Sequence, residues 1–368
     1  MSAHVETPAA AKAPDTADTR PWPVVLLTAL GAWLSALPLV VVAGMLFGDV
    51  LTHGTGPYVC GVLVLIGGLV VCRSREVPMF AEQLAVPALL AGGGLLGLGL
   101  YRDLDDGSAS LVLGSLALLV AGLIPQAWLR VVLGGAAAGF VLAGVMTAGH
   151  SPGSSTWHGW AGLHLLLLTW ALVWTQAGLL SSNPAARAAG GRVSAREAIG
   201  TGWLLATLFG LAMWSGMSFL VGGAVGLQGG SFSGPSWAGP QAALMQAASV
   251  ALALAAAVVL ARRWPLMRQP AVVTALLVVA ALAWWLPTLG AIVFVLALTT
   301  TGHRWRLAGA AALAAAWVIG SFYYLLQWPL SVKALWLLGS GAVLAALAWW
   351  MHLTGPDGQG PRSAITPP

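Results

Sequence analysis

Long apolar segments, separated by short polar stretches, run along almost the whole chain. Most are close to the 20 or so residues that a helix needs to cross a hydrocarbon core of about 30 Å. No connection is long enough to form a separate soluble domain. The pattern predicts an all-α fold, a polytopic integral membrane helical bundle of about 12 transmembrane helices, at residues 24–47, 57–72, 80–101, 108–125, 127–149, 159–182, 200–227, 241–261, 271–286, 288–301, 307–326 and 329–352.

The two ends of the chain lack this apolar pattern. Residues 1–20 are rich in Ala, Thr, Pro and Asp and are too polar to pack, so we expect a disordered cytoplasmic tail there and a second one over residues 353–368. The first apolar run is too long for the core of a signal peptide, and we expect it to remain as the first span. Residues 21–352 are then predicted to form a single transmembrane helical domain.

The positions of the 16 Lys and Arg residues give the orientation. With a cytoplasmic N-terminus, only Arg102 and Lys333 fall on the outer side. Cationic loops resist translocation, so this asymmetry predicts that both termini are cytoplasmic. The other fourteen fall on the inner side, namely Lys12, Arg20, Arg73, Arg75, Arg130, Arg187, Arg192, Arg196, Arg262, Arg263, Arg268, Arg304, Arg306 and Arg362.

The segment between Arg268 and Arg304 must contain an even number of spans, because both cations favour the cytoplasm. One helix over this stretch would be about 48 Å long, far more than the core. Pro287 breaks helices, and Trp284 and Trp285 suit the aromatic belt at an interface. We therefore predict two short or tilted spans joined by an outer turn at Pro287.

Composition limits the chemistry. Hydrophobic residues make up 58% of the chain and charged residues 7%, and the mean hydropathy is +0.86. No nucleophile triad, phosphate-binding loop or zinc-spaced cysteine pair occurs, so we expect no catalytic residue, no cofactor, no metal and no nucleic-acid partner. The expected surroundings are the lipid bilayer. Asp103, Asp105 and Asp106 share an outer turn and leave open a metal-assisted enzyme acting on a lipid-linked donor.

Glycines are abundant and clustered, which has two interpretations. The GxxxG pairs Gly93 and Gly97, Gly135 and Gly139, and Gly222 and Gly226 allow close approach of helix backbones. The alternative is an interrupted helix that lines a binding cavity, as in transporters. In the third span this alternative involves Gln83, Pro87, Gly92, Gly93 and Gly94.

A polar cluster is predicted at the outer end of the last two spans. Lys333 lies one turn into the final span, close to Tyr323, Tyr324 and Gln327, which offer acceptors for its ammonium. Such a cluster could hold an anionic headgroup or a partner. The alternative is that Lys333 extends outward to the headgroups as an anchor.

The stretch 321–335, with its Tyr-rich helix end, Pro-Leu step and Lys-Ala-Leu helix start, resembles the bacterial membrane family catalogued as domain of unknown function 4401. Pro21 and Trp22 leading into 31–34 look like its opening, and 80–84 looks like its third-span start. The resemblance covers residues 21–352, although that family would have a second Gln where Gly94 stands. It supplies no activity. It implies a multi-pass protein of the bacterial inner membrane, accompanied by another multi-span membrane protein.

Three classes of function remain open. The expected one is a non-enzymatic component that acts with other membrane proteins. A small-solute or lipid transporter fits the six-plus-six layout around residues 183–199, although no repeat aligns between the halves. An enzyme acting on a lipid-linked substrate fits only the outer acids. A closed apolar bundle with an exposed groove would favour the partner role, and repeat symmetry would favour transport.

Overall fold

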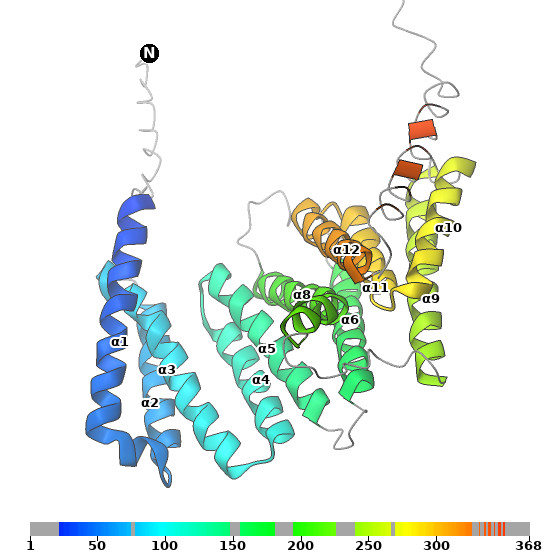
Figure 1. Cartoon of the computed structure of the whole chain (residues 1–368). Helices are drawn as coiled ribbons and strands as arrows, with labels where there is room; N and C mark the ends of the chain where they lie inside the picture. Colours follow the sequence, from blue (N-terminus) through cyan, green and yellow to red (C-terminus); the bar gives the residue numbers. More distant parts are fainter. Residues whose placement is uncertain are drawn as a thin grey trace, which may run out of the picture. The chain divides into compact units, whose positions relative to one another are not determined.

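The computed structural model describes residues 22–74, 78–147, 155–180, 194–225, 240–265 and 269–325, with a few scattered positions between 331 and 349. Every regular element in these residues is an α-helix (Figure 1). The chain groups into two compact units, Met1–Asp105 with Leu123–Gln126, and Asp106–Gly122 with Ala127–Pro368. The single domain expected over residues 21–352 stays a prediction.

Each predicted span that falls on the described residues is a helix. The first unit holds α1 (Trp22–Thr52), α2 (Gly56–Arg73) and α3 (Met79–Asp103). The helices of the second unit are α4 (Asp106–Leu123), α5 (Ala127–Thr147), α6 (Ser155–Leu180), α8 (Ala195–Val225), α9 (Pro240–Arg263), α10 (Pro270–Trp285), α11 (Leu289–Thr301) and α12 (Trp305–Leu325). The twelfth predicted span, 329–352, lies outside the described residues apart from scattered positions.

Length and composition show a membrane protein. Six helical segments of the described chain are long and apolar enough to cross a bilayer, namely Gly56–Arg73, Gln83–Asp103, Asp106–Leu123, Ala127–Thr147, Ala195–Ser215 and Pro240–Arg263. Shorter apolar stretches of α1, α10, α11 and α12 accompany them. Many large apolar side chains remain exposed, such as Met45 at 81% and Leu313 at 73%. In lipid these side chains meet acyl chains, so their exposure is compatible with a stable fold.

In the first unit, α2 and α3 pack through glycine. A Cβ atom added to Gly92 would lie 2.8 Å from the backbone N of Leu65 and 2.9 Å from the carbonyl O of Gly61. Neither glycine could carry a side chain without movement of the backbone. At the other end of α2, the Gln126 side chain donates a hydrogen bond of 2.9 Å to the Cys72 carbonyl, which ties residues 123–126 to this unit.

In the second unit, α5 and α8 approach even more closely. A Cβ on Gly202 would overlap the carbonyl O of Val131, and one on Gly134 would overlap that of Ile199. Small residues permit such backbone contact, which replaces the missing hydrophobic effect between helices in lipid. Next to this crossing, fully buried side chains of α8, α11 and α12 form the core, including Leu204, Leu211, Ile292, Val295 and Val318.

The turn after α11 is stabilised by its backbone and by an ion pair. His303 has φ +56°, and the N–H of Arg304 donates 2.8 Å to the Thr299 carbonyl, which is the hydrogen bond of a Schellman cap. The Arg304 guanidinium then lies 3.2 Å from the Glu197 carboxylate in the first turn of α8. The start of α8 and the end of α11 therefore lie side by side at one end of the unit.

Candidate functional site

The predicted polar cluster near the C-terminus cannot be assembled from the described atoms. Tyr323 and Tyr324 belong to the last turn of α12, but their side chains lie outside the described part, as do Gln327 and Lys333. The cluster stays a prediction.

The third span is helical over its whole length. The backbone of α3 runs from Met79 to Asp103 through Pro87 and the three glycines. Pro87 has no N–H, so the Gln83 carbonyl cannot receive its usual helical hydrogen bond, but the helix continues past that point. Gly92 packs against α2, whereas nothing lies within 4 Å of a Cβ added to Gly93 or Gly94. Packing explains Gly92, and α3 shows no break at the other two glycines.

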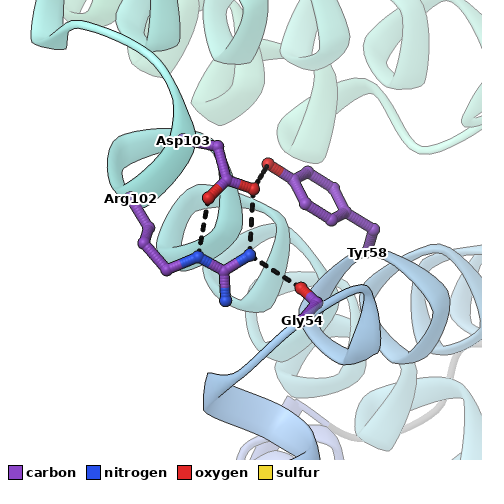
Figure 2. Close-up of polar contacts among 4 residues, drawn as sticks. All are labelled: Gly54, Tyr58, Arg102 and Asp103. Carbon is purple, nitrogen blue, oxygen red and sulfur yellow. Dashed lines mark hydrogen bonds and ion pairs between the residues drawn. The ribbon is translucent and has the colours of Figure 1, made fainter.

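The acidic turn between α3 and α4 contains a clasp, which we define as Gly54, Tyr58, Arg102 and Asp103 (Figure 2). Arg102 Nε donates 2.7 Å to Asp103 Oδ1, and Arg102 Nη2 donates 2.9 Å to Oδ2. The same Nη2 donates 2.7 Å to the Gly54 carbonyl, and the Tyr58 hydroxyl donates 2.9 Å to Asp103 Oδ2. The clasp thus ties the end of α3 to the α1–α2 turn and to the first turn of α2.

The clasp limits what the Asp103 carboxylate can bind. Arg102 and Tyr58 donate hydrogen bonds to the Asp103 carboxylate, and these contacts favour its ionised form. Both carboxylate oxygens already accept hydrogen bonds. Among the described residues, no three His, Cys, Asp or Glu side chains gather where they could hold a metal ion. Asp103 therefore serves to fix the α1–α2 turn.

A dense polar arrangement in the described part of the second unit surrounds the buried turn, which we define as residues 286–288 between α10 and α11. Leu286 and Pro287 are buried and Thr288 is fully buried. Trp160 Nε1 of α6 donates 3.2 Å to the Pro287 carbonyl. Ser249 Oγ of α9 donates 3.1 Å to the Leu286 carbonyl and accepts 3.1 Å from the backbone N–H of Gly290. Two neighbouring helices thus satisfy polar backbone groups that α10 and α11 leave open.

Side chains from two helices complete the buried turn. The hydroxyls of Ser215 in α8 and Thr288 share a short hydrogen bond. The Trp160 ring lies between two other rings of α6. Its centroid is 5.4 Å from the centroid of the Trp157 ring and 3.9 Å from that of the His164 ring. His164 Nδ1 lies 2.8 Å from the Trp160 carbonyl. Three helices, α6, α8 and α9, therefore each contribute a side chain to the buried turn.

The polar groups around the buried turn hold neighbouring helices together through hydrogen bonds. The hydroxyls bond neighbouring groups, and the first N–H groups of α11 are also engaged: Leu289 donates 2.9 Å to Leu286, and Ile292 donates 3.2 Å to Thr288. An anion at this helix start would find those donors occupied. The buried turn is a junction between helices.

The second unit also carries an apolar hollow, which we call the α9–α10 groove. It has a volume of about 510 Å³ and lies between these two helices. All of its lining residues are aliphatic: Leu254, Ala257, Val258, Ala261, Val273, Leu276 and Leu277. A groove of this kind accepts an apolar helix or an acyl chain.

Few sequence signals point to these features. Ser249 was not predicted to matter, because a Ser inside an apolar helix most often bonds its own backbone. Tyr58 could have been suspected, since a phenol at the start of a span next to an outer turn has a polar group to satisfy. A Trp near the start of a span usually suits the interface belt, but the Trp160 N–H donates a hydrogen bond inside the unit.

Comparison with known proteins gives one match, to a protein family. Residues 21–354 match the family described as Domain of unknown function (DUF4401). No curated protein and no solved structure matches the chain.

Proposed function

This chain belongs to the DUF4401 family, and from that premise we propose that it is a non-enzymatic component of the bacterial inner membrane that acts with another multi-span membrane protein. The chain itself is a membrane protein with several apolar helices. The partner role, the membrane and the orientation are the parts that we propose.

The proposed orientation has about twelve membrane-embedded helices and cytoplasmic termini. Its support is the charge asymmetry, with only Arg102 and Lys333 on the outer side. The ion pair between Arg304 and Glu197 adds support, because it brings together two segments that the charge argument places in the cytoplasm independently.

Reporter fusions test the orientation. A reporter after Gly190 should be active as a cytoplasmic fusion, and one after Gly234 should be active as an exported fusion, because α8 lies between them. Paired reporters that respond in the two compartments, such as an alkaline phosphatase and a fluorescent protein, check each position twice. The same location for both fusions would contradict the orientation.

The observation that carries the partner role is the α9–α10 groove. The core of the second unit is closed, with Leu204, Ile292 and Val295 fully buried, and the hydroxyls around the buried turn bond neighbouring helices. The groove, in contrast, opens at the surface of the unit, where Leu254 and Leu277 are exposed, and is aliphatic throughout. In lipid, helix association depends on close packing, and a preformed hollow offers a complementary helix more contact than a convex surface does.

A photo-crosslinking side chain in the groove tests this role. At Leu277, which is 58% exposed and lines the groove, it should give one discrete adduct of higher mass in intact membranes. At Leu313, which is 73% exposed on α12 and does not line the groove, it should give lipid adducts only. The protein captured in the Leu277 adduct should also co-purify with the unmodified chain. Lipid or intrachain adducts alone at Leu277 would overturn the partner role.

Transport is the second candidate, and the buried turn is the observation that favours it. Transporters place irregular backbone inside the membrane, where it is buried in protein or lines a cavity. A transport cycle would expose Thr288 to water from both sides in turn. Labelling of a cysteine at Thr288 by impermeant thiol reagents from each side, in a background without Cys60 and Cys72, distinguishes this candidate from a static junction.

A further inference from the structure

We infer that α10 and α11 form a re-entrant hairpin. α10 starts and α11 ends at the cytoplasmic side, and the two helices meet at the buried turn inside the hydrocarbon core without crossing the membrane. This inference rests on the proposed orientation, which identifies the cytoplasmic side. It replaces two of the twelve predicted crossings by a helix pair that crosses none.

The lengths of the two helices give the first argument. α10 has 16 residues and α11 has 13, so they are about 24 Å and about 20 Å long. A hydrocarbon core of about 30 Å is longer than either helix. α9 has 24 residues and is about 36 Å long, so it can cross.

The level of the buried turn along α9 gives the second argument. Ser249, which bonds both Leu286 and Gly290, lies near the middle of α9. The stretch of α9 from Ser249 to Pro240 continues for about 14 Å beyond the turn. On the other side, Ala280 and Ala283 pack with Ala253, so α10 follows the C-terminal half of α9. Figure 1 shows the α10–α11 turn opposite the middle of α9.

The polar contacts of the turn give the third argument. A turn at the outer surface could leave its carbonyls to water, whereas irregular backbone at membrane depth must be satisfied by protein. The carbonyls of Leu286 and Pro287 both accept hydrogen bonds from side chains of other helices. Thr288 is fully buried. These are the contacts that a turn within the hydrocarbon core requires.

The charge asymmetry is equally compatible with this arrangement. Arg268 and Arg304 stay on the same side whether two spans or none separate them. The outer belt position assigned to Trp284 and Trp285 then becomes unnecessary, because these exposed side chains face acyl chains. The hairpin also gives the second unit hydroxyls and carbonyls near mid-membrane, which a continuous apolar helix lacks.

A depth measurement tests the hairpin in the full-length protein. Single spin labels are placed at Trp285 and at Gln241, both exposed, after replacement of Cys60 and Cys72, and the protein is reconstituted in lipid. Collision rates with oxygen and with a polar nickel complex report the depth of each label. The Trp285 label should lie about 12 Å deeper than the Gln241 label, with high oxygen and low nickel collision rates. Equal, shallow depths for the two labels would overturn the hairpin.

Two controls keep the result interpretable. A label at Trp284, which is 45% exposed, repeats the measurement if the Trp285 variant does not fold. The reporters after Gly190 and Gly234 are measured in the same background. A deep Trp285 label with both reporters in one compartment would refute the orientation and support the hairpin. A shallow label with the reporters in opposite compartments would refute the hairpin alone.

Discussion

Replacement of Gly202 by valine should prevent α5 and α8 from packing and remove most of the folded protein. The Cβ alone would overlap the Val131 carbonyl, and a rigid helix backbone cannot yield as a side chain does. Overpacking costs about 1–3 kcal/mol where the surroundings can relax, and we expect a loss of about 3 kcal/mol or more here. Fluorescence-detected size-exclusion chromatography of detergent extracts should show aggregate in place of the sharp peak of the native protein.

The matched control is Gly139→Val in α5. Nothing lies within 4 Å of a Cβ at Gly139, so the same substitution meets open space and should leave the peak and the melting temperature within a few degrees of the native protein. A native-like elution profile for both variants would contradict the close approach of α5 and α8.

Replacement of Gly290 by alanine should destabilise the second unit by about 1–3 kcal/mol, although alanine normally favours a helix. The added Cβ would overlap the Ser249 carbonyl and lie 2.8 Å from Ser249 Oγ, so α11 must move away from α9. That movement would stretch the bond from Gly290 N–H to Ser249. The melting temperature in detergent, followed by the amount of soluble protein after heating, measures the loss.

Gly309→Ala in α12 is the corresponding control. Nothing lies within 4 Å of its Cβ, and the gain in helix propensity predicts no change or a stabilisation of about 0.5–1 kcal/mol. Opposite signs for the two Gly→Ala variants are the expected result. A stabilising effect at Gly290 would show that α11 does not contact α9 as closely as described.

The apolar pattern located the helices, because a membrane helix must be apolar over its length whatever it contacts. The predicted spans 57–72 and 241–261 differ from α2 and α9 by one or two residues at each end. Helix ends are marked by local chemistry such as the Ser194 hydroxyl, which accepts 3.2 Å from the Glu197 N–H at the start of α8. Such signals are contained in a few neighbouring residues, so a sequence can show them.

Helix contacts were harder to predict, because they join residues far apart in the chain. Of the glycines that the GxxxG rule selected, Gly135 lies at the α5–α8 contact, where an added Cβ would be 3.3 Å from the Gly202 carbonyl O, whereas Gly93 and Gly139 face open space. The close contacts are Gly61 with Gly92, and Gly134 and Gly202 with backbone carbonyls across α5 and α8. The spacing of glycines along one helix predicts which of them share a face. The partner helix determines which face forms the contact.

The buried turn shows the same limit for polar groups. Pro287 marked a break between helices, and the structure has that break. Its burial depends on Trp160, more than a hundred residues earlier, and on Ser249 in another helix. The break was therefore visible in the sequence, whereas the groups that satisfy it were not.

The clasp has a consequence for how the first unit is assembled during biosynthesis. In the proposed orientation Arg102 is one of two cations that must be translocated, and its carboxylate partner Asp103 is the next residue in the chain. The two charges can therefore pair while α3 is still being inserted, before it packs against α2, and can cross the membrane as a neutral ion pair. Tyr58 and Gly54 join only when α2 and α3 align. The clasp would then act as a checkpoint for the α2–α3 hairpin, because an incorrectly paired hairpin would leave the guanidinium without the Gly54 carbonyl.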